Sequence, residues 1–184
     1  QTQVATVIPY FLRFIERFPT LPDLAAASTD DVMAHWAGLG YYARARNLHR
    51  CAQIVVEEHG GQFPRSPEAI AELPGIGRST AAAIAAFCFD NRCAILDGNV
   101  KRVLCRHQGI EGFPGVRAIE QKLWTLAESL LPDRDVGLYT QAMMGLGATV
   151  CTRGKPDCPH CPVAAGCIAH ASNRTAELPT SRPK

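Results

Sequence analysis

Residues 73–102, LPGIGRSTAAAIAAFCFDNRCAILDGNVKR, decide the fold. The stretch opens with a glycine turn, Pro74 to Gly77, which leads directly into a small-residue segment predicted to be a helix over residues 78–89. Backbone N–H groups at the start of such a helix can hold an anion such as a DNA phosphate. The stretch closes with Asp97, just ahead of a second predicted helix. A phosphate-binding turn is thus followed, about twenty residues later, by a placed carboxylate.

Helical patterns continue on both sides of this stretch, and no run is typical of a strand. Apolar residues recur at spacings of three and four over residues 1–18, and Ser, Thr or Asp caps precede residues 29–36 and 67–73. Further helices are predicted over residues 43–59, 99–108, 116–131 and 136–150. These patterns predict an all-α fold.

The composition is that of an ordinary globular protein. The chain has 184 residues, of which 47% are hydrophobic and 20% charged, with a formal net charge of +2. No apolar run approaches the roughly 20 residues that span a bilayer, and no secretion signal is present, which predicts a cytoplasmic protein of the bacterial nucleoid. Local basic segments at residues 41–50 and 92–106 suit a phosphate backbone as well as they suit a solvated helix face.

The eight cysteines fall into two groups. The scattered ones lie in apolar helical sequence and are predicted to be small buried hydrophobic residues; they are Cys51, Cys88, Cys93 and Cys105. The crowded ones follow the spacing C-x6-C-x2-C-x5-C and are predicted to hold one metal centre; they are Cys151, Cys158, Cys161 and Cys167.

Four thiolates fit either a tetrahedral zinc ion or a [4Fe–4S] cluster, and the ligand set alone does not choose between them. Because four thiolates complete the set, the nearby His160 and His170 are expected to be surface residues. The glycine turn and Asp97 have plain structural alternatives too, as an interhelical turn and as a helix N-cap. The glycine turn and Asp97 can each have the structural role and the functional role together.

Three features occur in an order and at spacings typical of one family: the glycine turn, the segment LDGNVKR at residues 96–102 and the cysteine loop. The segments GLGYYARARN at residues 38–47 and QAMM at residues 141–144 extend the likeness over nearly the whole chain. The chain resembles the catalytic domain of the MutY-type adenine DNA glycosylases, within the endonuclease III or helix-hairpin-helix glycosylase superfamily.

The resemblance implies a two-lobed all-α fold with DNA between the lobes. Residues 1–108 would form a helical-barrel lobe that contains the helix-hairpin-helix, about residues 66–89, and the catalytic aspartate. Residues 109–184 would form a second lobe with a [4Fe–4S] loop at residues 151–167 and a C-terminal linker.

The function implied is DNA base-excision repair: hydrolysis of the N-glycosidic bond of adenine opposite 8-oxoguanine or guanine, after the base is flipped from the duplex. Asp97 matches the aspartate that stabilises the oxocarbenium-like sugar, and Asn99 would support it by hydrogen bonding. Ser79 stands where bifunctional relatives carry a lysine that forms a Schiff base, which implies a monofunctional hydrolase.

The implied partner is double-stranded DNA containing A:8-oxoguanine or A:G pairs, bound by a monomer. At the lesion pair the resemblance places Gln1, Thr2, Leu39 and Tyr41, with the Tyr41 ring entering the base stack. The remaining predicted DNA contacts are Gly75, Gly77, Arg78, Lys101 and Arg102.

One feature departs from the family pattern. The family's general acid, a glutamate, precedes the Gln-Thr-Gln segment, whereas this chain starts at Gln1, and Glu16 does not match it. A missing general acid costs about 10²- to 10⁴-fold in rate, so residues 1–184 alone are expected to be nearly inactive. Two alternatives stay open: a cluster-bearing module that binds DNA lesions without catalysis, and a related glycosylase for thymine or another base.

Overall fold

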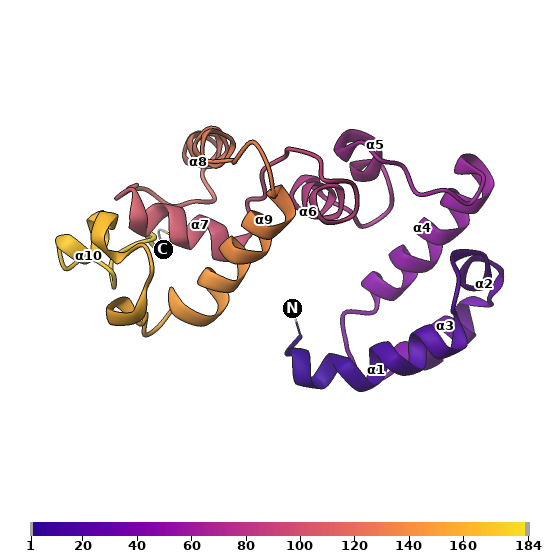
Figure 1. Ribbon diagram of the computed structural model, residues 1–184. Helices are drawn as coiled ribbons and strands as arrows, with labels where there is room; N and C mark the ends of the chain where they lie inside the picture. The colour runs from indigo at the N-terminus through magenta and orange to yellow at the C-terminus, as the bar shows by residue number, and fades with distance from the viewer. Residues whose placement is uncertain (1, 183–184) are drawn as a thin grey trace. The chain divides into compact units, whose positions relative to one another are not determined.

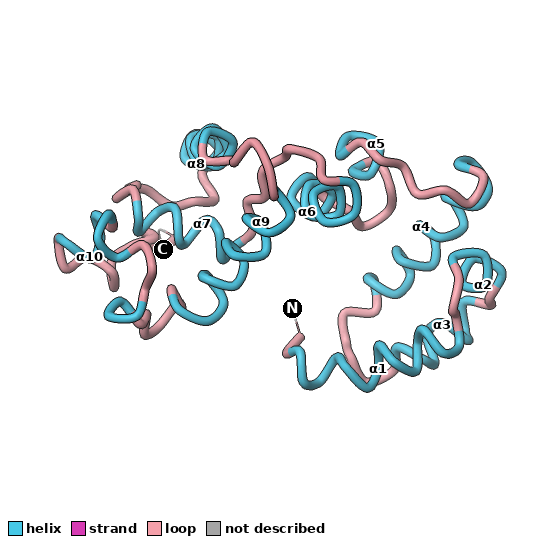
Figure 2. Tube along the Cα trace, viewed as in Figure 1, coloured by secondary structure: helices cyan, strands magenta, loops and turns pink. Residues whose placement is uncertain are grey.

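The computed structural model describes residues 2–182, and within that range the chain forms helices, turns and loops but no strand (Figures 1 and 2). The predicted all-α class is confirmed. Gln1, a predicted DNA contact, lies outside the described residues. The chain divides into two compact units, Gln1–Gly77 and Arg78–Lys184. Across residues 2–182, no helix combines the length and the apolar character needed to cross a membrane.

The first unit contains five helices within its described residues: α1 Val4–Arg17, α2 Leu21–Ala26, α3 Thr29–Trp36, α4 Ala43–His59 and α5 Pro67–Ala71. Helices α2 and α3 pack against α4 around a small core of Phe18, Leu24, Val32 and Ala52. Helix α2 was not predicted. Its start is a capping box, in which the Thr20 side chain and the Asp23 side chain each accept the other's backbone N–H.

The glycine turn closes the first unit. The N–H of Ile76 donates to the carbonyl of Leu73 at 3.2 Å, with Pro74 and Gly75 as the two central residues. Gly75 has φ +77°, as the third position of a type II turn requires, and a Cβ there would lie 2.7 Å from Cβ of Asn47. Only glycine therefore fits at this position.

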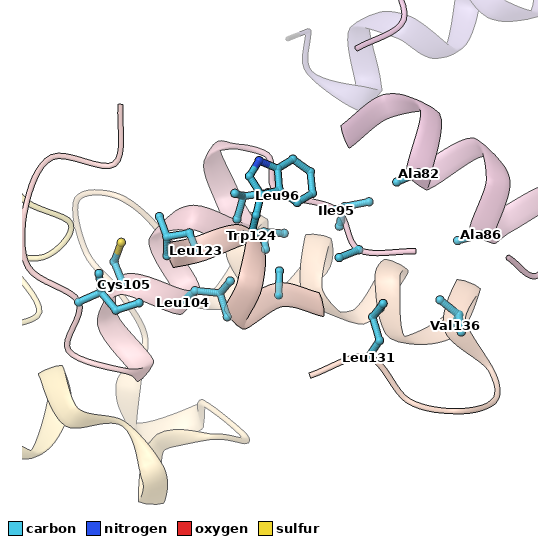
Figure 3. Packing of buried hydrophobic residues seen from close by; sticks show 14 residues of the cluster. Ala82, Ala86, Ile95, Leu96, Leu104, Cys105, Leu123, Trp124, Leu131 and Val136 are labelled. Atoms are coloured by element: carbon cyan, nitrogen blue, oxygen red, sulfur yellow. The ribbon is translucent and has the colours of Figure 1, made fainter. Parts of the chain in front are cut away.

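The second unit contains α6 Arg78–Phe89, α7 Gly98–His107, α8 Arg117–Ser129, α9 Val136–Gly145 and α10 Ile168–Ala171, with a π-helix, η1 Leu146–Val150. Its core joins the small residues of α6 to larger side chains of α7 and α8, as Figure 3 shows for Ala82, Leu104 and Trp124. Helix α7 packs against α8, α9, α10 and η1 (Figure 1).

The division at Gly77 differs from the boundary predicted at residue 108. Helix α6 packs against α9, and α7 packs against α8 and α10, so residues 78–108 share a core with the C-terminal half. Apolar periodicity indicates which face of a helix is buried, but it does not indicate which helix covers that face. The boundary between the two units depends on which helices pack together.

Two further details differ from expectation. Residues 136–150 were predicted as one helix, but the last turn is the π-helix η1, a form that often occurs at functional sites. Cys88 was predicted to be buried but is exposed, because α6 buries Ala81, Ala82, Ala85 and Ala86 and turns position 88 outward. The burial of Cys51 and Cys105 is confirmed, and Cys93 is half-buried.

Candidate functional site

Asp97 is the N-cap of α7. Its Oδ1 accepts the backbone N–H of Val100 at 2.8 Å, and the side chain is half-buried. The segment that leads to it is held by Ser79 on α6, whose Oγ accepts the N–H of the buried Leu96 at 2.9 Å. Helices α6 and α7 therefore both orient the Asp97 carboxylate. Ser79, which was singled out for the absence of an amine, positions the segment that leads to Asp97.

Replacing Ser79 with alanine is expected to destabilise the protein by about 1–3 kcal/mol, because the buried N–H of Leu96 loses its acceptor. The measurement is the free energy of unfolding in urea. Ser129→Ala is the matched control, since that exposed hydroxyl only donates to the carbonyl of Leu126 at the end of α8. Equal stabilities for the two variants would contradict the role given to Ser79.

Arg102 joins Asn99 to the start of the cysteine loop. Its Nη2 donates to Oδ1 of Asn99 at 2.8 Å and to the carbonyl of Gly147 at 2.6 Å, and its Nε donates to the carbonyl of Cys151 at 2.8 Å. Burial lowers the pKa of Arg102, while Cys151 and Asp97 raise it. The guanidinium stays charged, but the three hydrogen bonds direct it into the protein. The contact of Arg102 with DNA stays a prediction.

The close approach at this point depends on Gly147 of η1. A Cβ on Gly147 would lie 2.6 Å from Cβ of Asn99, so a larger residue would push η1 away from α7. The π-helix thus brings the Gly147 carbonyl within reach of Arg102. No sequence pattern distinguishes this glycine from an ordinary helical one.

Asp97 and Asn99 line a cavity of about 720 Å³. The same cavity is lined by Lys101, Arg102 and, from the C-terminal segment, Arg182. Asp97 is the acidic residue of the lining, and the other charged residues are basic, which suits a ligand that carries phosphate groups and develops positive charge near the carboxylate. All of these residues belong to the second unit.

The two other cations predicted to bind DNA are paired with carboxylates of α8. Nζ of Lys101 lies 2.5 Å from Oε1 of Glu120. Nη2 of Arg78 lies 2.6 Å from Oε1 of Glu128, and the Arg78 guanidinium stacks 3.7 Å above the Trp124 ring. The sequence patterns did not indicate these partners.

The first unit brings together the residues predicted for the lesion pair, apart from Gln1. Thr2 and Leu39 line an apolar cavity of about 480 Å³, and the Tyr41 side chain is 70% exposed. Arg44 connects them, because it donates to Oγ1 of Thr2 at 3.3 Å and lies 5.3 Å from the Tyr41 ring centre. Arg44 belongs to the basic segment at residues 41–50, but its contacts with Thr2 and Tyr41 were not predicted.

Tyr41 also has an unusual backbone conformation, with φ +49°. Such a conformation costs a non-glycine residue energy and tends to persist at functional positions. It occurs in a turn whose flanking Gly38 and Gly40 have φ +100° and +69°. The strained turn presents the ring to solvent, which is consistent with the predicted role of Tyr41.

The four crowded cysteines line one small cavity, together with Arg106. Two 3₁₀ turns, η2 Cys158–His160 and η3 Ala164–Gly166, shape the loop, and His160 and His170 are exposed as predicted. Burial raises the pKa of Cys158, and the thiolates of Cys167, Cys151 and Cys161 raise it further. Metal ligands must be deprotonated, so a bound metal centre would favour the thiolate forms of these cysteines.

As the side chains stand over residues 2–182, no group of three or more His, Cys, Asp or Glu is arranged to hold a metal ion. One zinc ion would draw four sulfurs to about 2.3 Å from a single point. A [4Fe–4S] cluster instead binds each cysteine at a different iron atom. In the chemistry of the donor set, four thiols that line a shared cavity fit either group.

Arg106 holds the cysteine loop, and the sequence patterns did not indicate this. Its side chain, 3% exposed, donates to the carbonyls of Thr152 at 2.6 Å, Arg153 at 3.1 Å and Leu178 at 2.8 Å. It also donates to Sγ of Cys151 at 3.4 Å. One buried cation therefore connects α7, the start of the loop and the C-terminal segment.

Two of the scattered cysteines, Cys51 and Cys105, lie in the core. Burial raises the pKa of the Cys105 thiol to about 11, despite the opposing effect of Lys101, and burial also raises the pKa of Cys51. Both thiols stay protonated at neutral pH and are poor ligands and nucleophiles. These surroundings agree with the prediction that Cys51 and Cys105 are small buried residues.

Several curated proteins are similar to the chain along almost its whole length. It is 49% identical to the adenine DNA glycosylase of Rattus norvegicus over 98% of the chain, and 49% identical to that of Homo sapiens over 92%. It is 43% identical to the adenine DNA glycosylase of Buchnera aphidicola subsp. Schizaphis graminum over the full chain. The chain spans only 36%, 31% and 53% of these relatives, respectively.

Solved structures share the fold. A thermostable thymine-DNA glycosylase matches with a TM-score of 0.83 and 27% identity, covering 93% of the chain and 79% of that structure. A non-covalent endonuclease III–DNA complex matches with a TM-score of 0.77 and 24% identity, covering 92% and 78%. The predicted helix-hairpin-helix glycosylase fold is therefore confirmed.

The family model described as "HhH-GPD superfamily base excision DNA repair protein" matches residues 1–129. That match covers the glycine turn, Ser79, Asp97 and Asn99, which the structure places at the turn and around the start of α7. The chain belongs to the HhH-GPD superfamily of base excision DNA repair proteins.

Proposed function

We propose that residues 1–184 form the glycosylase region of an adenine-specific mismatch repair enzyme, which hydrolyses the N-glycosidic bond of adenine opposite 8-oxoguanine or guanine. The observation that supports this proposal most is Asp97, a half-buried carboxylate fixed at the start of α7, on the wall of a cavity whose other charged residues are basic. Identities of 43–49% to adenine DNA glycosylases support adenine as the base.

Asp97 would face the sugar as the glycosidic bond breaks and positive charge develops on the ring. Because Oδ1 already accepts a backbone N–H, the carboxylate is oriented before the substrate arrives. Asn99, whose Oδ1 accepts a hydrogen bond from Arg102, would support Asp97 by hydrogen bonding.

Adenine leaves poorly unless it is protonated. By the family resemblance, the proton comes from a glutamate that precedes the Gln-Thr-Gln segment, and residues 1–184 supply the cation-stabilising side of the reaction. Ser79 offers no amine, and its hydroxyl is bonded to the N–H of Leu96. We therefore propose base release without cleavage of the DNA strand.

DNA would be held by groups of both units. The turn at Gly75 and Gly77 would offer backbone N–H groups to a phosphate. Thr2, Leu39 and Tyr41 would contact the lesion pair, and Arg78, Lys101 and Arg102 remain proposed phosphate contacts. The enzyme would act as a monomer on duplex DNA containing A:8-oxoguanine or A:G pairs, in the bacterial cytoplasm.

The experiment that tests the function uses a chain extended at its N-terminus to include the glutamate. We expect free adenine from A:8-oxoguanine and A:G duplexes, with strand breaks only after heat or alkali. Release of thymine from T:G duplexes instead would favour the thymine alternative, which the fold match to a thymine-DNA glycosylase supports. Lesion binding without release of any base would identify a non-catalytic module.

The cysteine loop is proposed to hold a [4Fe–4S] cluster through Cys151, Cys158, Cys161 and Cys167, with Arg106 beside it. Such a cluster supplies a structural crosslink with redox capability when bound. The residues around it fix the loop next to α7 and Arg102.

The purified protein is expected to be brown and to contain about four iron atoms per chain. Cys158→Ser is expected to lose most of this iron because it removes one thiolate ligand. Cys88→Ser is the matched control, since that exposed cysteine lies on α6, outside the loop. A colourless protein that contains zinc would contradict the cluster.

A further inference from the structure

We propose that one face of α8 carries a counterion row, Glu120, Trp124 and Glu128, which holds the DNA-directed cations Lys101 and Arg78 in the free protein and limits binding to undamaged DNA. The inference rests on the proposed function, because it takes duplex DNA as the ligand. It assigns a role to three residues that do not themselves need to contact DNA.

The three residues lie at positions i, i+4 and i+8, which puts them on one side of the helix. Each contacts one of the two cations: Glu120 pairs with Lys101, while Trp124 and Glu128 both contact Arg78. A single helix face therefore serves cations from the starts of two different helices, α6 and α7.

The two pairs differ in exposure. The Lys101 side chain is 22% exposed and lines the cavity that contains Asp97, so its pair with Glu120 is partly shielded from solvent. Arg78 and Glu128 are 58% and 52% exposed, and water and salt screen that pair. A phosphate could replace the Glu128 carboxylate while the stacking on Trp124 keeps the guanidinium in position.

The two arginines that connect α7 to the cysteine loop, Arg102 and Arg106, have a different kind of hydrogen-bond partner. The oxygen acceptors of Arg102 and Arg106 are neutral carbonyls, five from the backbone and one from the Asn99 side chain. Lys101 and Arg78 instead have charged partners that an incoming phosphate must displace or tolerate. Of the three proposed phosphate contacts, Lys101 and Arg78 therefore have a carboxylate partner in the free protein, whereas Arg102 is bonded only to neutral oxygens.

The consequence concerns selectivity. Affinity for DNA of any sequence comes mainly from release of counterions as cations neutralise phosphates. A cation that keeps a carboxylate partner adds less to this release, so each pair weakens binding to undamaged duplex. At a lesion, contacts to the flipped base and the abnormal pair would offset the free-energy cost of displacing the carboxylates from Lys101 and Arg78.

The test measures binding of an undamaged duplex by fluorescence anisotropy over a series of salt concentrations, for the unsubstituted chain and for Glu120→Gln, Glu128→Gln and the double variant. Glutamine keeps the size and the hydrogen-bond acceptor of glutamate. We expect tighter binding at low salt and a log–log salt slope that is steeper by about 0.9 for each carboxylate removed. Glu111→Gln is the matched control, because its carboxylate pairs with Arg174, which does not line the Asp97 cavity.

Unchanged or shallower slopes in both single variants, with duplex binding by the unsubstituted chain intact, would overturn the counterion row and leave the proposed function standing. No duplex binding by the unsubstituted chain at any salt concentration would overturn both. Circular dichroism and urea unfolding of each variant separate a change in slope from a loss of fold.

Discussion

Asp97→Asn is expected to reduce adenine release by about 10³-fold or more while leaving the fold intact. Asparagine is also a good N-cap, so its side-chain oxygen can still accept the N–H of Val100 and start α7. The negative charge, however, is lost, and with it the stabilisation of the cationic sugar. Single-turnover release of adenine from an A:8-oxoguanine duplex measures the effect, in the chain extended to include the general acid.

The matched control for this variant is Asp133→Asn. Asp133 is 99% exposed and its carboxylate is 3.8 Å from Arg92, so the substitution changes the net charge equally without touching the cavity. We expect its rate to equal that of the unsubstituted protein. Adenine release that survives Asp97→Asn would sink the assignment of Asp97, and urea unfolding would show whether the cap had been kept.

Arg106→Met is expected to destabilise the second unit by about 3 kcal/mol or more and to lower its iron content. Methionine fills much of the same space, but it leaves the carbonyls of Thr152, Arg153 and Leu178 without their donor. Hydrogen bonds from a charged donor are each worth about 1.5–3 kcal/mol, and buried acceptors left unpaired add to the cost. The measurements are the free energy of unfolding in urea and the iron bound per chain.

Arg92→Met is the control for this prediction. Arg92 also donates to two carbonyls, those of Leu131 and Pro132, but its side chain is 51% exposed, so water can replace it. We expect a loss below about 1 kcal/mol and an unchanged iron content. If Arg106→Met were no more damaging than Arg92→Met, the organising role of Arg106 would be wrong.

Much of the local structure followed from local chemistry. Ser28 and Ser66 cap α3 and α5 as predicted, and α4 ends at Gly60 in the left-handed conformation. Asp97 caps α7, which begins at Gly98, one residue before its predicted start. These features depend on a few adjacent residues, which is why the sequence was enough to place them.

The candidate site was predictable in part. Asp97 and Asn99 lie at the start of α7, Ser79 on α6 contacts the residue before Asp97, and the four crowded cysteines line one cavity. The residues that hold them were not predicted. Arg106 bonds to residues between 45 and 72 positions away in sequence, and no local pattern encodes such pairings.

By itself, the sequence determined the all-α class, the glycine turn, the cap at Asp97 and the grouping of the cysteines, because each arises from residues close together in the chain. Tertiary structure alone decided which helices share a core, that η1 approaches Asn99 at Gly147, and that α8 supplies the partners of Lys101 and Arg78. These outcomes depend on packing between segments that are distant in the sequence. The periodicity of one helix does not distinguish among its possible partners, and burial and charge pairing in the folded protein select one of them.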